Sequence, residues 1–330
     1  MGVARWLRVI SAVALWACAT GGLAQKKAGD PADNYPNKPI RWIIDFPAAG
    51  VSDLLARIVG ARLSENFNQS IVYDNRPGAN GIIANEMVAK APADGYTLGF
   101  ISQPFSLQLT VHPKLAFKLE SFAPVSFLAM YPSILVVHPK SPVGSVKEFI
   151  AYAKGRKPPI SYASSGAGGA QHLSMEIFRK KAGFDAVHVP YAGSQASLVD
   201  LIGGRVDATF ANVPGALPHL RGGRLKAIAL AAPERTRVLP EVPTFGEHGF
   251  AFESLGYAGA VFPAGVGKGI LAKMNAEIVR VIRRPDVQDK IYAAGGEPRA
   301  STPEEFAQYL RKDVAYWAPA IREAGATAQN

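Results

Sequence analysis

Cysteine is nearly absent from this 330-residue sequence, which contains a single one, Cys18. Cys18 lies in an N-terminal segment in which two arginines precede an apolar run from Val9 to Ala19, and small residues follow that run. This order predicts a secretory signal peptide over residues 1–24. Without that segment the chain has no cysteine, which excludes disulfide bonds and thiol catalysis and favours a bacterial periplasm as its location.

Lipid attachment is the alternative use of Cys18. The run Leu15-Trp16-Ala17-Cys18 could be a lipoprotein processing site, but the bulky Trp16 stands where small residues are usual. We therefore expect export without a lipid anchor.

Long apolar runs and metal-binding spacings are also missing. No apolar run after the leader is long enough to cross a bilayer. The histidines have no paired spacing, so we expect no metal and no cofactor. They are His112, His138, His172, His188, His219 and His248.

The charges are scattered along the chain. The formal net charge is +10, and removal of the leader leaves 34 basic and 26 acidic residues, or +8. Basic residues form no single stripe and are not interleaved with aromatic residues, so nucleic acid is not an expected partner. A mildly positive field suits anionic ligands.

Strand patterns alternate with helix patterns after residue 36, which predicts an α/β fold with mainly parallel sheets flanked by helices. Two long extended segments, 122–139 and 233–256, could carry the chain between two sheets. We therefore predict two lobes, one formed by residues 36–134 with 254–330 and the other by residues 135–253.

Three strand–loop–helix junctions are the main functional signal, at residues 41–60, 160–178 and 188–204. In each, small residues precede the start of a helix. The free N–H groups and the dipole of a helix start attract anions. Because ligands bind at the carboxyl ends of strands in such sheets, we expect a cleft that holds a small organic acid. The candidate contacts from these junctions and nearby strand ends are Asp53, Gln103, Ser164, Ser165, Gly166, Gly168, His172, Tyr191, Gly193, Ser194 and Asn212.

Several of these residues have a purely structural alternative. Asp53 could be a favourable partner of the helix dipole or a cap, or it could bond loop N–H groups or a ligand amino group. Tyr191 could be a core aromatic or a cleft wall. Gln103 and Asn212 could each stabilise a loop. The glycine loop at 164–169 is neither a dinucleotide fingerprint nor a P-loop.

An exported serine hydrolase is the main rival interpretation. Ser165, His172 and Asp207 could form a catalytic triad. However, the glycine-flanked nucleophile elbow is missing, and His172 lies only seven residues after Ser165 on the same predicted helix. We therefore expect a binding protein and not an enzyme.

The sequence resembles the Bug family, the periplasmic solute receptors of tripartite tricarboxylate transporters. The resemblance covers nearly all of the chain after the leader. It is carried by the runs YPNKPIRWIIDFPAAGVSDLLAR, DNRPGANGIIANEMVAKAPADGYTL, SYASSGAGGAQHLSMEIF, HVPYAGSQASLVDLIGGRVDATF, RVLPEVPTFGEHGF and STPEEFAQYLRKDVAYW.

The resemblance implies a two-lobed periplasmic binding protein of type II, or Venus-flytrap, architecture that closes on a small carboxylate. The ligand would be a di- or tricarboxylate, an aromatic acid or an acidic amino acid. The receptor would be a monomer that delivers it to membrane transporter subunits, or a ligand-sensing subunit for a membrane signalling protein. The resemblance also implies ligand contacts from the loops at 47–53, 164–169 and 191–194. This adds four residues to the candidate contacts, Ala49, Gly50, Val51 and Ser52. The family often has two glycines after the FPA run, whereas Ala49 precedes Gly50 here.

Overall fold

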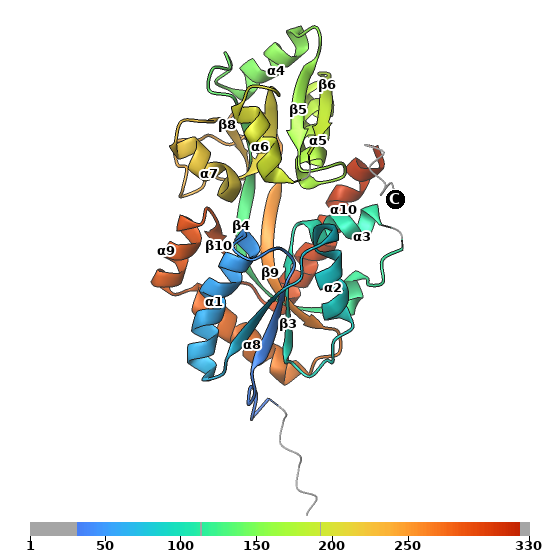
Figure 1. Cartoon of the computed structure of the whole chain (residues 1–330), viewed down its shortest axis with the longest axis vertical. Coiled ribbons are helices and arrows are strands. Elements are labelled where there is room, and N and C mark those ends of the chain that lie inside the picture. The colour runs from blue at the N-terminus through green and yellow to red at the C-terminus, as the bar shows by residue number, and fades with distance from the viewer. Residues whose placement is uncertain (1–31, 113, 192, 324–330) are drawn as a thin grey trace, which may run out of the picture.

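The computed structural model describes residues 32–112, 114–191 and 193–323. The predicted signal peptide, including Cys18, lies outside these residues. Within them the chain is an α/β protein in which helices flank a long mixed sheet (Figure 1). Every helix of the described ranges is too short or too polar to span a membrane.

The strands follow the alternation expected from the sequence and cover most of the predicted strand segments. They are β1 (Ile40–Ile44), β2 (Ile71–Asn75), β3 (Thr97–Ser102), β4 (Phe122–Val137), β5 (Ile160–Ser164), β6 (Ala186–Pro190), β7 (Ala208–Asn212), β8 (Lys226–Ala231), β9 (Leu255–Pro263) and β10 (Glu297–Pro298). Their order in the sheet is β2-β1-β3-β9-β4-β7-β5-β6, and β8 and β10 also pair with β4.

Helices connect the strands and close the chain. The α-helices are α1 (Val51–Phe67), α2 (Ile82–Ala89), α3 (Pro104–Val111), α4 (Val146–Gly155), α5 (Ala170–Ala182), α6 (Ser194–Ile202), α7 (Val213–Arg221), α8 (Lys268–Ile282), α9 (Pro285–Ala293) and α10 (Pro303–Glu323). Two short 3-10 helices are η1 (Ala79–Gly81) and η2 (Leu119–Ser121).

The sequence predicts that Ser145 caps a helix over residues 146–154 and that Thr302 and Glu305 form a capping box at the start of the last helix. Both start signals are confirmed. The Ser145 hydroxyl accepts a hydrogen bond from the Glu148 N–H at the start of α4. At the start of α10, the Glu305 N–H donates to Thr302 Oγ1 at 3.1 Å and the Thr302 N–H donates to Glu305 Oε2 at 2.9 Å. Each reciprocal bond satisfies an amide that the helix leaves free.

The long strand β4 belongs to both halves of the sheet. Up to Pro132 it pairs with β9, and from Ser133 to Val137 it pairs with β7 and β8. Beside this change of partner, the Ser133 N–H donates to the Ser254 carbonyl at 2.8 Å. Gly256 allows the close approach, because a Cβ there would lie 2.3 Å from the Tyr131 ring. Figure 1 shows β4 and β9 passing between an upper and a lower group of helices.

The sheets are more mixed than the sequence predicts. The outer pairs β1–β2, β1–β3, β5–β6 and β5–β7 are parallel, as expected. At the centre, β9 is antiparallel to β3 and β4, and β4 is antiparallel to β7 and β8. β4 carries the chain from the first half to the second, and β9 carries it back. These two strands therefore run in opposite directions instead of forming a parallel βαβ unit.

Buried side chains form separate clusters in the two halves. The first half packs large residues such as Trp42, Phe100 and Phe262 around its sheet. The second half centres on Phe178 and Phe210. A smaller apolar cluster connects α3, α5 and α10 across the halves, and its buried members are Leu107, Leu173, Trp317 and Ile321.

Candidate functional site

The carboxyl ends of the strands in the two halves point toward each other. β1 and β3 run in the same direction as β4. β3 ends at Ser102, which pairs with Ala258 of β9, and Ala258 pairs in turn with Ala129 of β4. β5 and β7 run against β4, and β7 ends at Asn212, which is level with Ser133. The loops and helix starts that follow these strands therefore lie on the facing edges of the halves (Figure 1). Ligands of open parallel sheets bind at edges of this kind.

The loop after β1 turns sharply into α1. Ala49 is exposed and has a φ of +65°, in the left-handed region that favours glycine. Gly50 is the N-cap residue of α1, whose first two residues are Val51 and Ser52. Gly50 has no side chain that could cap the first amides of this helix. The carbonyl of Phe46 accepts a hydrogen bond from Asn75 Nδ2 at 3.0 Å. The loop is thus fixed at its base, while its amides at the helix start lack a side-chain cap.

Asp53 holds this loop in place. Its Oδ2 accepts hydrogen bonds from the Ala49 N–H at 3.0 Å and from Arg57 Nε at 2.8 Å. Burial raises the pKa of Asp53, but these bonds outweigh it and bring the pKa below its usual value. Of the roles considered from the sequence, bonding of a loop N–H group is present in this structure.

Asp45 is a buried carboxyl that the sequence reasoning missed. It follows β1 directly and is 2% exposed. Its Oδ2 accepts a hydrogen bond from the Ser102 hydroxyl at 2.6 Å, and Oδ1 has no hydrogen-bond partner within the described part of the chain. Burial raises the pKa of Asp45 to about 7, although bonds from Ser102 and Ser52 oppose the shift. The neutral form of this side chain is therefore populated near neutral pH.

Gln103 lies at the same edge, directly after β3. It is the residue that precedes α3, and its side chain is 7% exposed. Its Nε2 has no hydrogen-bond partner among the described residues. An amide donor that is buried without a partner is unfavourable, so this group is a natural candidate for a ligand contact.

The glycine loop after β5 has a compact internal structure. Gly166 and Gly168 both have positive φ, at +130° and +74°. The Gly166 N–H donates to the Ser164 hydroxyl at 3.1 Å, and Gly169 is the N-cap of α5 without a side-chain cap. Ser165 is half-buried, between the two bonded positions. The predicted glycine loop at a helix start is therefore present.

His172 acts on the loop in this structure. Its Nδ1 accepts a hydrogen bond from the Gly168 N–H at 3.0 Å, so this amide is already engaged. The ring also stacks on His188 of β6, which the sequence reasoning did not select. His188 in turn lies 2.6 Å from the Ser164 hydroxyl through its Nε2.

The third junction lies beside the second. The Tyr191 N–H donates to the Ser164 carbonyl at 3.0 Å, because β6 pairs with β5. The Tyr191 hydroxyl donates to Asp200 Oδ2 at 2.7 Å, so it is directed at α6 and not left free for a ligand. Gly193, with a φ of +108°, is the N-cap of α6, and Ser194 is its first residue.

Asn212 caps a helix. Its Oδ1 accepts a hydrogen bond from the Gly215 N–H at 3.3 Å at the start of α7. A Cβ on Gly215 would lie 2.7 Å from this oxygen, so the glycine is needed for the cap. The loop-stabilising role considered from the sequence is therefore the one observed for its side-chain oxygen.

The residues of the rival triad are engaged in other contacts. Asp207 Oδ2 accepts hydrogen bonds from the N–H and the hydroxyl of Ser161, at 2.8 and 3.0 Å. His172 Nδ1, which would orient a catalytic histidine, accepts the Gly168 N–H. Among the described residues, no group of three or more histidine, cysteine or acidic side chains is placed to hold a metal ion.

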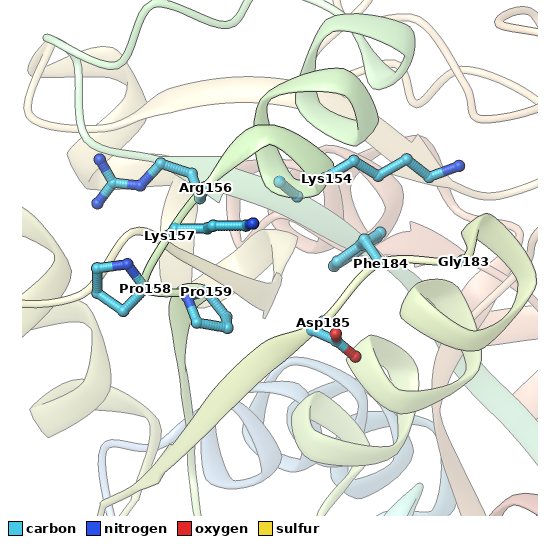
Figure 2. A pocket seen from close by; sticks show the side chains of 9 residues that line it. Lys154, Arg156, Lys157, Pro158, Pro159, Gly183, Phe184 and Asp185 are labelled. Carbon is cyan, nitrogen blue, oxygen red and sulfur yellow. The ribbon is translucent and has the colours of Figure 1, made fainter.

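A hollow of about 270 Å³ lies at the opposite end of β5, away from these loops. Its lining includes Lys154, Arg156 and Lys157 at the end of α4, and Asp185 after α5 (Figure 2). Basic side chains at the end of a helix offset the negative end of its dipole. The hollow adjoins the amino end of β5, whereas the candidate site lies at the carboxyl end.

The chain matches a family model described as "Tripartite tricarboxylate transporter family receptor" over residues 55–326. It is 34% identical to Protein BugT of Bordetella pertussis, over 93% of this chain and 95% of that protein. Among solved structures it is similar to an R. palustris protein solved with adipate, with 32% identity, a TM-score of 0.79, and coverage of 89% of this chain and 99% of that one.

A second solved structure from Rhodopseudomonas palustris, MatC with bound malate, is 28% identical to this chain. Its TM-score is 0.74, and the match covers 87% of this chain and all of that one. These likenesses agree with the α/β periplasmic binding protein fold and with the Bug resemblance. The chain belongs to the tripartite tricarboxylate transporter receptor family and is a periplasmic solute receptor, not a hydrolase.

Proposed function

We propose that this receptor binds a small organic dicarboxylate between the two halves of its sheet and delivers it to the membrane subunits of a tripartite tricarboxylate transporter. One observation carries the proposal. The carboxyl ends of β1 and β3 point toward those of β5 and β7, with α1 and α5 starting from these edges without side-chain caps. Free amides on both sides can donate to the two ends of one dianion.

The two halves act as lobes in this proposal. Residues 36–134 with 254–330 form the first lobe, and residues 135–253 form the second. The bonded pair Ser133 and Ser254 marks the crossing between them. Bending at this level would bring the loops together over the ligand, as in other hinge closures.

Amides, hydroxyls and one side-chain amide provide the contacts. The first lobe would use the loop of Ala49, Gly50, Val51 and Ser52 together with Gln103. The second would use Ser165 and the starts of α5 and α6, with Gly193 and Ser194. Asp53, Ser164, Gly166, Gly168, His172, Tyr191 and Asn212 would shape these loops through the bonds described above.

The ligand class follows from the donors and from the relatives. Neutral donors suit carboxylates, and the two similar structures contain adipate and malate, which are both dicarboxylates. Linear dicarboxylates are therefore the first ligands to test. Tricarboxylates, aromatic acids and acidic amino acids belong in the same screen.

Export and partners complete the proposal. The signal peptide at residues 1–24 directs the chain to the periplasm, where it acts as a monomer without a lipid on Cys18. A ligand-sensing subunit would use the same closed form and differ only in its membrane partner.

Isothermal titration calorimetry on ligand-free protein tests the binding step. We expect adipate or malate to bind with a stoichiometry near one and to raise the melting temperature. An absence of heat and of thermal shift with every acid of the screen would overturn the proposal.

A pair of matched variants locates the site. Ser194→Asp adds a negative charge at the first residue of α6, where an acid favours the helix but repels an anionic ligand. Ser145→Asp adds the same charge at the cap of α4, a helix that ends at the hollow far from the site. We expect a loss of affinity of roughly tenfold or more for Ser194→Asp only. Equal affinities in the two variants would place the ligand elsewhere.

A further inference from the structure

Two imidazole rings stack directly behind the glycine loop. The rings of His172 on α5 and His188 on β6 have centroids 4.0 Å apart and planes 9° from parallel. Tyr162 of β5 lies beside both imidazoles, with its ring centroid 5.0 Å from that of His188 and 6.3 Å from that of His172. His172 is 8% exposed and Tyr162 is fully buried. Three successive elements therefore contribute one ring each to a cluster in which the two imidazoles stack on each other.

Each imidazole bonds one end of the loop. His188 Nε2 and the Ser164 hydroxyl are 2.6 Å apart, and Ser164 is the last residue of β5. His172 Nδ1 accepts the Gly168 N–H at 3.0 Å, immediately before the N-cap of α5. The stack thus connects both ends of the segment that carries Ser165. Neither ring nitrogen in these bonds is free to contact a ligand.

We propose that His172 and His188 are positioning residues that hold the 164–169 loop in the shape in which its remaining amides bind the carboxylate. The proposal rests on the proposed function, because it assigns the loop to the ligand. The pair acts as a clamp: the stack fixes the distance between the rings, and each ring fixes one loop position. Loss of either bond releases one end of the loop.

The clamp requires a neutral His172, because a protonated Nδ1 cannot accept the Gly168 N–H. Burial lowers the pKa of His172. Burial and the neighbouring His172 lower the pKa of His188 to about 4. Two cations with ring centroids 4.0 Å apart would also repel each other. Acid therefore opens the clamp, and the protein keeps it closed at neutral pH.

Two buried acidic groups lie on the elements of this region. Glu176 is paired with Arg179, whereas Asp313 Oδ2 has no hydrogen-bond partner among the described residues, and burial raises the pKa of Asp313 to about 6. On α5, the Glu176 carboxylate accepts hydrogen bonds from Arg179 Nε and Nη2, both at 2.6 Å, and from the Tyr162 hydroxyl at 2.7 Å. On α10, which packs against α5, Asp313 accepts the Trp317 Nε1–H at 3.1 Å and the Tyr316 hydroxyl donates to the Glu253 carbonyl.

The remaining elements around α5 bring neutral groups. β7 contributes Thr209, whose hydroxyl donates to the Ala163 carbonyl, and α3 contributes Leu107. His172 is therefore the group of this cluster whose protonation breaks a loop contact, since His188 Nε2 can either donate to or accept from the Ser164 hydroxyl.

Variants of His172 separate its bond from its ring. His172→Phe keeps a stacking ring but removes the acceptor, so the buried Gly168 N–H loses its partner. We expect affinity for a dicarboxylate to fall by roughly tenfold. His172→Asn offers an oxygen near the position of Nδ1 and should retain more affinity than His172→Phe. His188→Phe and His188→Gln repeat the comparison at the other end of the loop.

A matched control is His138→Phe. His138 Nδ1 accepts the Lys140 N–H at 3.1 Å in a turn after β4, which is the same kind of bond at a distance from the loop. We expect this variant to bind as the wild type does. Thermal melting of all variants establishes that they fold.

The pH dependence of ligand affinity distinguishes the clamp from a purely structural role of His172, which would not change with pH. The ratio of wild-type to His172→Asn affinity cancels the ionisation of the ligand itself. We expect this ratio to fall as the pH drops from 7 to 4, because only the wild type loses its acceptor.

Three outcomes are decisive. Binding that weakens in His172→Phe, recovers in part in His172→Asn and shows the pH-dependent ratio supports the clamp. Wild-type binding with unchanged affinity in both phenylalanine variants overturns the clamp and leaves the proposed function intact. No carboxylate binding by the wild type overturns both.

Discussion

Replacement of Asp45 by asparagine should stabilise the protein at alkaline pH. The carboxyl is 2% exposed, and no basic side chain is among the causes that shift its pKa. The neutral Ser102 hydroxyl donates a hydrogen bond to it at 2.6 Å. Asparagine has nearly the same shape, retains an oxygen for this bond and carries no charge. It therefore mimics the protonated carboxyl.

The magnitude follows from the pKa of Asp45, which burial raises from 3.8 to about 7. The folded state holds the proton more tightly than the unfolded state, so this group's stabilising contribution is complete below pH 3.8. It is lost progressively as the pH rises to 7. The loss at pH 8 is on the order of 4 kcal/mol. Asp45→Asn should recover most of it, which corresponds to a rise of roughly 5–10 °C in melting temperature.

Urea unfolding of the wild type and Asp45→Asn between pH 4 and 8.5 measures this effect. The difference between the two free energies of unfolding should be small near pH 4 and grow up to about pH 7. Other titrating groups contribute equally to both proteins and cancel. Dicarboxylate affinity should also rise in the variant at pH 8, where the wild type has a carboxylate beneath the loop.

Asp74→Asn is the matched control because the pKa of Asp74 moves the other way. Burial raises the pKa of Asp74, but hydrogen bonds from Arg41 and Arg76 outweigh it and lower the pKa below its usual value. This variant should be less stable than the wild type at pH 8. The reasoning would be refuted if Asp45→Asn were as stable as the wild type, or less stable, at every pH.

Three further changes test other parts of the structure. Ala49→Gly removes the strain of a φ of +65° and should stabilise the protein by about 0.5–1 kcal/mol, measured by thermal melting; a lower melting temperature would contradict this. Leu173→Ala opens the buried cluster that it shares with Trp317 and should cost about 2–5 kcal/mol in urea, so a loss under 1 kcal/mol would show that the cluster packs loosely. Asp207→Asn disturbs the acceptor of the Ser161 N–H and hydroxyl and should cost about 1–2 kcal/mol with unchanged ligand affinity in calorimetry, whereas a large loss of affinity would connect Asp207 to the site.

Local sequence signals predicted most of the elements. The helical spacing predicts helices that start at Val51 or Ser52 and at residue 171, and α1 and α5 begin at Val51 and Ala170. The caps at Ser145 and Thr302 form as predicted, because cap chemistry depends only on a few neighbouring residues. The glycine loops also follow from local sequence, since small residues at a strand–helix junction restrict the backbone alternatives.

The missed elements have ambiguous local signals. α7 contains Pro214, Gly215 and Pro218, which weaken a helical pattern, and the sequence predicts no helix there. β9 is rich in small residues, including Gly256 and Gly259, and its strand character comes from pairing on both sides. A Cβ on Gly259 would lie 2.1 Å from the Phe306 ring, so this glycine serves packing rather than a turn. Without β9, the antiparallel centre of the sheet could not be predicted.

The site residues missed from the sequence depend on tertiary contacts. Asp45 resembles an ordinary acid at a strand end, and only the fold places Ser102 and Ser52 around it and excludes water. His188 is part of a strand pattern. It reaches His172 because β6 pairs with β5 while α5 packs over the same edge. Sequence spacing alone contains neither relationship.

A crystal structure of the protein with a bound dicarboxylate tests the central claim most directly. The account predicts one carboxylate within hydrogen-bonding distance of the free amides at residues 51–53 and the other near Ser165 and the start of α5, with the two halves closer together than in the free protein. A dicarboxylate bound in the hollow beside Lys154, or held by one half alone without any closure, would contradict it.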